Sequence, residues 1–385
     1  MLNRRGFGKT IAASVATSMA ALSTGVIAPA EAAAPKPRKI LKVRLGGEYR
    51  FGDGGTISKQ NLEYQGRWGI KYLTTSVENG PRASPGVADP PPGAPKAGRM
   101  VPSQPWNLDA LKHMQDVCQQ NGKVLEGIRM DSAYMIMKPG PERDRYLDLI
   151  CDNVRKAGQA GITVISKHWS VNFLRRNTSP AGRGGSTYTG FKLEDNWKDL
   201  PVTVERVSSD DYWERIDTFL KKVIPVARES KVKMAVHPYD PGGLPLGYMG
   251  VDNWDAVDFV KAMLRYEKTF DDPHNAFQYD TGVAAESMNG PDLQLDLLRG
   301  LVQRGKVAQI HFRNIRGHLN DFVEVYHDEG DVNLFAIIKL LRDLDWEGSL
   351  LPDHSPVHPD DPQQLQGFAF ANGYITGLLK AAQDA

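Results

Sequence analysis

This chain of 385 residues has few cysteines, almost no net charge and no long apolar run. Its two cysteines, Cys118 and Cys151, are too few for a disulfide framework, and both fall in segments of helical periodicity, so we expect buried free thiols rather than a disulfide. Lys and Arg number 47 against 46 Asp and Glu, which leaves no basic excess to attract nucleic acid. No strongly apolar run reaches the roughly 18 residues that span a membrane. These absences argue against a nucleic-acid-binding protein, a disulfide-framed scaffold and a membrane-spanning protein.

The N-terminus carries a targeting pattern. Residues 3–9 read NRRGFGK, and a mildly apolar stretch from Ile11 to Ile27 is followed by the small-residue string APAEAAA. This pattern resembles a twin-arginine export signal with cleavage near Ala32. We therefore expect residues 1–32 to be an export signal and residues 33–385 to work in the periplasm, or otherwise outside the cytoplasm, without membrane attachment. An ordinary secretory signal and a retained N-terminal anchor are the alternatives.

Eight short apolar segments with strand character alternate with helical patterns along the rest of the chain. The expected strands are Leu41 to Leu45, Ile70 to Thr75, Val124 to Met130, Thr163 to His168, Lys233 to Pro238, Ala276 to Thr281, Val307 to Asn314 and Ser349 to Asp353. The expected helices include Leu108 to Asn121, Glu142 to Ala157, Ser209 to Glu229, Trp254 to Thr269, Asp292 to Gln303, Val332 to Leu344 and Pro362 to Ala381. Alternating strands and helices predict a parallel sheet, and eight repeats predict a (β/α)8 TIM barrel forming one domain over residues 33–385.

Two connections are longer than the roughly two to six residues typical of such barrels. They run from Pro81 to Pro105 and from Trp169 to Asp199, and each follows the C-terminal end of an expected strand. Because a TIM barrel keeps its active site at that end, we expect both loops to act as lids or substrate walls. A disordered surface insert is the alternative for the first loop.

Four expected strands in the second half of the chain each end in a side chain that binds metals. These residues are His237, Asp280, His311 and Asp353, and they lie 43, 31 and 42 residues apart. This spacing is close to one strand-helix unit, so we expect the four side chains to meet at the C-terminal mouth of the barrel. Two imidazoles and two carboxylates suit Mn²⁺, Zn²⁺, Co²⁺ or Fe²⁺. We expect manganese, with separate polar strand ends as the alternative interpretation.

Several motifs in this region resemble mannonate dehydratase, a metal-dependent enzyme of the xylose-isomerase-like TIM barrels. They are AVHPYDP, YDTG, IHFRNIR, FVEVYHDEGDVNL and PDH, in this order. The resemblance implies dehydration of D-mannonate, or a related sugar acid, to a 2-keto-3-deoxy product with a divalent ion, usually manganese. It also implies that the family's His, Cys, His and Asp ligands correspond to His237, Asp280, His311 and Asp353. The catalytic histidine of the family then corresponds to His354.

The chain departs from the family pattern at several positions. Asp280 stands where the family has Cys, and this hard carboxylate favours Mn²⁺ or Mg²⁺ over Zn²⁺. Tyr239 stands where the family's HPDDPP has a carboxylate, so we expect it to contact the substrate. The tyrosine of the family's GYGL-type segment is missing after PDH. These departures leave open a substrate other than D-mannonate. Related sugar epimerases and isomerases also pair an Asp with a His at these middle positions, so the site combines the two patterns.

Five further residues are candidates for the site. Arg313 lies two positions after His311 and is a second catalytic candidate, because a guanidinium can hold a carboxylate with two hydrogen bonds. Arg183 in a glycine-rich loop, His168 at a strand end and His327 are candidates for substrate binding. Glu324 and His327 are spaced one helical turn apart. Each also has a structural interpretation, as an ion pair, a core histidine or a surface pair.

The favoured function is a metal-dependent carbon–oxygen lyase of carbohydrate metabolism that eliminates water from an aldonic or uronic acid. The ion would stabilise the enolate formed beside the carboxylate, and His354 would act on the departing hydroxyl. A sugar isomerase or epimerase, a β-eliminating lyase, and a non-catalytic sugar-acid-binding protein remain alternatives. The expected partner is a small sugar acid or an oligosaccharide-derived substrate, and a homo-oligomer is left open. No strand-GxxxxGK[ST]-helix context for a nucleotide is present.

Overall fold

The computed structural model describes residues 40–48, 55–76, 102, 104–171, 174, 176–202, 205–288, 290, 293–361 and 363–384. Lys39–Ala385 forms one compact unit. The expected export signal and most of the expected loop from Pro81 to Pro105 lie outside the described residues, so both stay predictions. Within the described ranges, no helix is long and apolar enough to cross a membrane.

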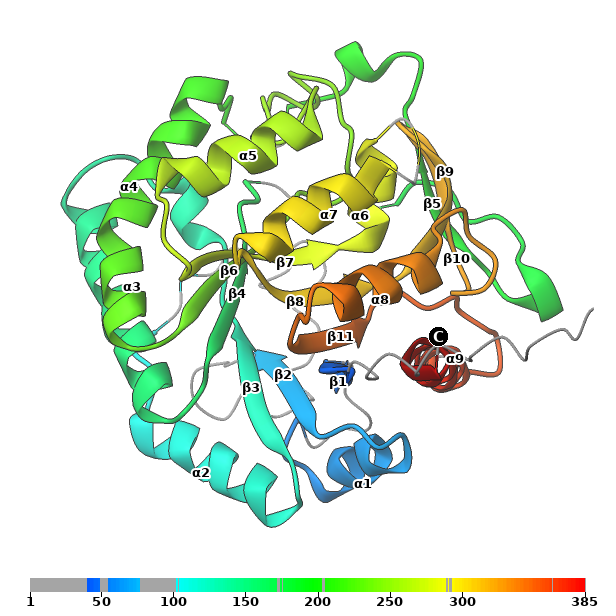
Figure 1. Ribbon diagram of the computed structural model, residues 1–385. Coiled ribbons are helices and arrows are strands. Elements are labelled where there is room, and N and C mark those ends of the chain that lie inside the picture. The colour runs from blue at the N-terminus through cyan, green and yellow to red at the C-terminus, as the bar shows by residue number, and fades with distance from the viewer. Residues whose placement is uncertain are drawn as a thin grey trace, which may run out of the picture. The chain divides into compact units, whose positions relative to one another are not determined.

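Eight parallel strands close into a barrel in the order β1-β11-β8-β7-β6-β4-β3-β2 (Figure 1). They are β1 (Val43–Gly47), β2 (Tyr72–Ser76), β3 (Val124–Arg129), β4 (Val164–His168), β6 (Lys233–His237), β7 (Asn275–Asp280), β8 (Val307–Phe312) and β11 (Gly348–Pro352). Every expected strand is present, with boundaries shifted by two residues or fewer. The predicted (β/α)8 fold is confirmed.

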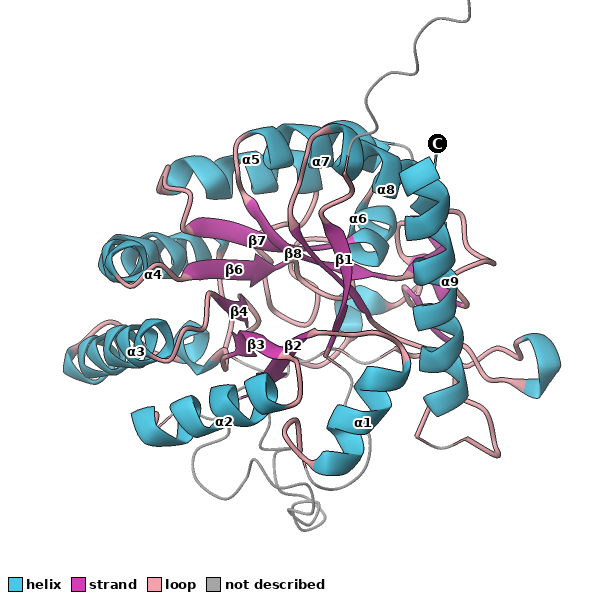
Figure 2. Ribbon diagram, turned by 60° about the horizontal axis from the view of Figure 1, so that its bottom comes forward, coloured by secondary structure: helices cyan, strands magenta, loops and turns pink. Residues whose placement is uncertain are grey.

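Helices surround the strands (Figure 2). They are α1 (Lys59–Arg67), α2 (Leu108–Gln120), α3 (Pro141–Gln159), α4 (Ser209–Glu229), α5 (Phe259–Thr269), α6 (Thr281–Ser287), α7 (Leu293–Gln303), α8 (Leu334–Asp343) and α9 (Leu365–Asp384). Capping residues set their starts. Ser208 and Asp211 form a capping box at α4, and Asp258 accepts a hydrogen bond from the Lys261 N–H, so α5 begins later than the expected Trp254. Cys118 and Cys151 are buried and unpaired, as expected.

A second sheet of three antiparallel strands adjoins the barrel. It has the order β5-β10-β9, with β5 (Thr189–Lys192), β9 (Asn314–His318) and β10 (Asp321–Val325). Strand β5 belongs to the expected loop from Trp169 to Asp199, and β10 pairs with it along Asp321 to Glu324. The helical interpretation of Glu324 is therefore wrong: it lies in β10, which is held as a strand by pairing with β5 on one side and β9 on the other.

The barrel interior is filled below its mouth. Ala235 and Ala276 lie on the same strand faces as His237 and Asp280 and belong to a small buried cluster separate from the main core. Glu126 accepts a hydrogen bond from Gln309 Nε2 at 3.0 Å in the same interior. Since side chains fill the barrel here, we expect a ligand to bind at the C-terminal end of the strands.

Candidate metal centre

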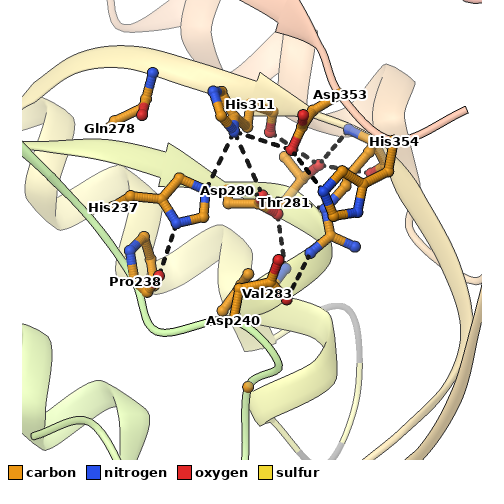
Figure 3. A network of polar contacts seen from close by, with 12 residues as sticks. His237, Pro238, Asp240, Gln278, Asp280, Thr281, Val283, His311, Asp353 and His354 are labelled. Atoms are coloured by element: carbon orange, nitrogen blue, oxygen red, sulfur yellow. Dashed lines mark hydrogen bonds and ion pairs between the residues drawn. The ribbon is translucent and has the colours of Figure 1, made fainter. Parts of the chain in front are cut away.

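Four side chains converge at the C-terminal mouth of the barrel (Figure 3). They are the expected residues His237, Asp280, His311 and Asp353, which offer ligand atoms within 4.8 Å of one another. His237 Nε2 lies 3.2 Å from Asp280 Oδ2 and 3.1 Å from His311 Nδ1. His311 Nδ1 lies 3.1 Å from Asp353 Oδ2. The predicted convergence is confirmed.

Local structure places each of these groups. His237 and Asp280 are the last residues of β6 and β7, His311 is one residue before the end of β8, and Asp353 directly follows β11. These four strands are consecutive neighbours in the barrel. Asp280 is also the N-cap of α6, where its Oδ1 accepts a hydrogen bond from the Val283 N–H at 2.7 Å. The second carboxylate oxygen of Asp280 is thereby left to face the histidines.

This donor set fits a divalent ion. Ligand bonds of about 2.1 Å place neighbouring ligand atoms about 3.0 to 3.4 Å apart in octahedral or tetrahedral geometry, close to the observed 3.1 to 3.7 Å. Burial lowers the pKa of His237 and so favours the neutral imidazole that binds metals. Although burial opposes it, the carboxylates of Asp353 and Glu48 raise the pKa of His311 well above its ordinary value. The carboxylates around His311 therefore favour a positive charge, such as that of a divalent ion, at the centre of the site.

Each histidine has a second partner that orients its ring. His237 Nδ1 lies 2.7 Å from the carbonyl oxygen of Pro238, and His311 Nε2 lies 2.8 Å from Glu48 Oε2. Glu48 follows β1 and forms an ion pair with Arg129, the last residue of β3. Sequence reasoning missed both Glu48 and Arg129. Their position at strand ends, the feature that identified the four expected residues, is the signal that was available for them.

His354 lies beside this cluster. Strand β11 ends at Pro352, and His354 has a φ of 46°, in the left-handed region, so its side chain does not follow strand alternation into the helix layer. Its Nδ1 lies 2.6 Å from Glu324 Oε1, and its Nε2 lies 3.6 Å from Asp353 Oδ2. Although burial lowers it, these two carboxylates raise the pKa of His354 to about 9.

Arg313 belongs to a buried network of charges at the mouth. Its Nε donates to Asp280 Oδ2 at 3.1 Å and its Nη2 to Glu286 Oε1 at 2.8 Å. Arg176, from the connection after β4, donates from Nε to Glu324 Oε1 at 2.8 Å and from Nη2 to Glu286 Oε1 at 3.2 Å. Sequence reasoning missed Arg176, because nothing in its local sequence marks it among the loop's charged residues.

The other expected substrate-binding residues lie in different settings. His168 is buried, and its ring packs on that of His237 with centroids 4.4 Å apart. His327 Nε2 lies 2.7 Å from the Phe312 carbonyl oxygen, and burial lowers its pKa to about 4. Tyr239 is buried after β6. Arg183 is 41% exposed and forms two hydrogen bonds with Asp328, at 2.7 and 2.9 Å.

The comparisons with known proteins agree with this geometry. Residues 193–385, half of the chain, match the family model described as D-mannonate dehydratase (UxuA). The chain belongs to the mannonate dehydratase family. The mannonate dehydratase of Streptococcus equi subsp. zooepidemicus is 27% identical over 357 residues, which cover 83% of this chain and 94% of that protein.

Solved structures show the same fold. The crystal structure of mannonate dehydratase from Streptococcus suis serotype 2 matches with a TM-score of 0.71 and 24% identity, covering 89% of this chain and 94% of the other. A xylose isomerase domain protein from Planctomyces limnophilus matches with a TM-score of 0.54 and 14% identity, covering 91% and 100%. These comparisons confirm the family resemblance and the xylose-isomerase-like fold. They also confirm the predicted function class, a sugar-acid dehydratase, which is a hydro-lyase. The family is metal-dependent.

Proposed function

We propose that this member of the mannonate dehydratase family dehydrates an aldonic acid, with D-mannonate as the first candidate, at a divalent ion held by His237, Asp280, His311 and Asp353. The observation that carries the proposal is the approach of these four ligand groups within 4.8 Å of one another at the mouth of the barrel. Manganese is the first choice of ion, because two carboxylates and two imidazoles form a hard, mixed donor set without thiolate.

The reaction removes a proton from C2 and a hydroxyl from C3 of the aldonate. The two leave together as one water, and the resulting enol becomes a 2-keto-3-deoxy acid. When bound, the ion supplies a positive charge that stabilises negative charge on the substrate's carboxylate end. Arg313 holds Asp280 through the 3.1 Å hydrogen bond from its Nε, so we assign Arg313 to orienting this ligand rather than to chemistry.

His354 is the proposed proton donor to the departing hydroxyl. Its Nε2 lies 3.6 Å from Asp353 Oδ2, which places the ring beside the proposed ion site. Glu324 accepts the hydrogen bond from His354 Nδ1 at 2.6 Å and fixes the orientation of the ring. An imidazole in this position can transfer a proton to a hydroxyl that is close to the ion.

Two departures from the family motif leave room for a sugar acid other than D-mannonate as the substrate. Tyr239 replaces a carboxylate directly after His237 and Pro238, where it is buried near the mouth. Asp280 replaces a thiolate. The substrate is therefore proposed only as a sugar acid of the aldonic or uronic class.

The protein is also proposed to work outside the cytoplasm. The support is the twin-arginine pattern NRRGFGK, followed by a mildly apolar stretch and a small-residue string. Twin-arginine export carries proteins that have already folded, which suits an enzyme that takes up its ion before export. Asp280 fits the same account, because a carboxylate is not oxidised outside the cytoplasm as a thiolate would be.

A panel of aldonic, uronic and keto sugars incubated with the manganese-loaded protein tests the proposal. Proton NMR should detect a deoxy methylene signal from one or more aldonates. Epimerisation of a keto sugar without formation of that signal would favour the isomerase and epimerase alternative. Substrate binding without any exchange of carbon-bound protons with solvent deuterium would favour the binding protein.

A further inference from the structure

We infer that Glu48 is a positioning residue that fixes the proton on His311 Nε2 and so directs the Nδ1 lone pair to the metal. The inference rests on the proposed function in one respect, since it assumes that the four-residue cluster binds a divalent ion. Glu48 belongs neither to this cluster nor to the proton-transfer pair of His354 and Glu324.

The two nitrogens of His311 face different partners. Nδ1 lies 3.1 Å from His237 Nε2 and 3.1 Å from Asp353 Oδ2, so it faces the proposed ligands. Nε2 lies 2.8 Å from Glu48 Oε2 and 3.4 Å from Arg129 Nη2, so the carboxylate is its nearer partner. Both nitrogens face a carboxylate, but Asp353 belongs to the cluster that would hold the ion, whereas Glu48 does not and can only accept a hydrogen bond. With an ion bound at Nδ1, the single proton of a neutral imidazole therefore belongs on Nε2, facing Glu48. That arrangement leaves Nδ1 free to bind an ion.

His237 shows that the two histidines are oriented by different means. Its Nδ1 donates to the neutral carbonyl of Pro238 at 2.7 Å, and its Nε2 faces the cluster. The two rings therefore present opposite nitrogens to the proposed ion. Because Glu48 carries a charge where Pro238 offers only a dipole, it strengthens His311 as an electron donor more than Pro238 strengthens His237.

The surrounding residues hold Glu48 in place. Arg129, at the end of β3, pairs with Glu48 Oε1, and the Glu48 side chain is 17% exposed. The preceding glycines allow β1 to lie close to its neighbours: a Cβ at Gly46 would lie 2.7 Å from Leu351 Cδ2, and one at Gly47 would lie 2.6 Å from Gln65 Oε1. The sequence GGE thus brings the carboxylate to the ring of His311.

The test measures binding of Mn²⁺ to metal-free protein by isothermal titration calorimetry. Glu48→Ala should weaken binding about 10- to 100-fold, the usual cost of removing a group that orients a ligand. The matched control is Glu347→Ala, which removes a carboxylate that pairs with Arg44 and is 67% exposed at the other end of β11. The control should bind Mn²⁺ as the wild type does, and both metal-free variants should melt near the wild-type temperature.

A spectroscopic measurement keeps the inference testable if Glu48→Ala fails to fold. In the zinc-loaded wild type, ¹⁵N NMR should show His311 protonated at Nε2 and bound through Nδ1, and His237 protonated at Nδ1. A His311 bound through Nε2 overturns the inference. So does unchanged Mn²⁺ affinity in Glu48→Ala, provided that His311→Ala loses the ion. If the wild type itself binds no divalent ion, the proposed function fails together with this inference.

Discussion

His354 Nδ1 lies 2.6 Å from Glu324 Oε1, and this contact joins the barrel to the three-stranded sheet. His354 follows β11, whereas Glu324 lies in β10 of the smaller sheet. The sheet therefore supplies the group that orients the proposed proton donor. Glu324 also lies 3.6 Å from Arg313 Nη1 and accepts a hydrogen bond from Arg176 Nε at 2.8 Å, so the sheet is connected to the buried charges at the mouth as well.

Replacement of His354 tests its role in proton transfer. His354→Asn should lower turnover about 10²- to 10⁴-fold, the usual contribution of a general acid or base, because asparagine cannot transfer the proton. Metal content and substrate affinity should stay near the wild-type values. Steady-state kinetics and elemental analysis of one preparation provide the check. Loss of metal along with turnover would assign His354 to support of Asp353 instead.

The four-residue cluster should hold close to one divalent ion per chain. His311→Ala should empty the site, since it removes a central ligand and leaves the carboxylates of Asp280 and Asp353 close together. Elemental analysis of purified protein, with a thermal shift on adding Mn²⁺, measures this. The variant His113→Ala, at a histidine outside the cluster, is the control. A wild type without metal and without a shift would disprove the proposed centre.

Asp280→Cys restores the thiolate of the family motif and should change which ion binds. A thiolate is a softer ligand, so competition between Zn²⁺ and Mn²⁺ should move toward Zn²⁺ in the variant. A loss of about 1 kcal/mol of stability should accompany the change, because the N-cap hydrogen bond from the Val283 N–H is removed. An unchanged preference between the ions would show that Asp280 does not bind the metal.

Much of this site follows from the sequence because strand ends in a TIM barrel occupy known positions. His237, Asp280, His311 and Asp353 each end or follow an apolar run, and the barrel brings such ends together. The three-stranded sheet could not be predicted in the same way. Its strand β5 pairs with β10 across more than a hundred residues of sequence, and a spacing of three residues between Glu324 and His327 also fits a helix.

A fully buried lysine gives a pH-dependent test of the core. Lys167 Nζ lies 3.2 Å from Tyr266 Oη and 4.3 Å from the centre of the Trp169 ring, and no carboxylate pairs with it among the described residues. Burial lowers its pKa well below the ordinary value. At pH values between the pKa of Lys167 in the folded protein and its pKa in the unfolded chain, the unfolded chain carries one more proton. The free energy of unfolding therefore rises with pH across this range and levels off above the unfolded-state pKa.

Lys167→Met removes this pH dependence of stability. The variant should be more stable than the wild type at pH 7, and its advantage should shrink by up to about 1.4 kcal/mol per pH unit as pH rises toward 10. Urea unfolding of both proteins at several pH values measures the difference. An advantage that stays constant with pH would indicate a lysine that remains charged in the folded protein.

Export should depend on the arginine pair Arg4 and Arg5. Replacing both with lysine should leave precursor in the cytoplasm, because the twin-arginine route reads the pair itself and not only its charge. Fractionation and immunoblotting show where the protein lies. Normal export of the double variant would indicate the general secretory route.

Turnover of a panel of aldonates, with D-mannonate first, by metal-free and manganese-reloaded protein tests the central proposal most directly. The reloaded protein should release a 2-keto-3-deoxy acid, the metal-free protein should not, and reloaded His311→Ala should behave like the metal-free protein. Equal turnover with and without the ion, or a protein that binds one Mn²⁺ per chain but dehydrates no aldonate, would contradict a metal-dependent sugar-acid dehydratase at this site.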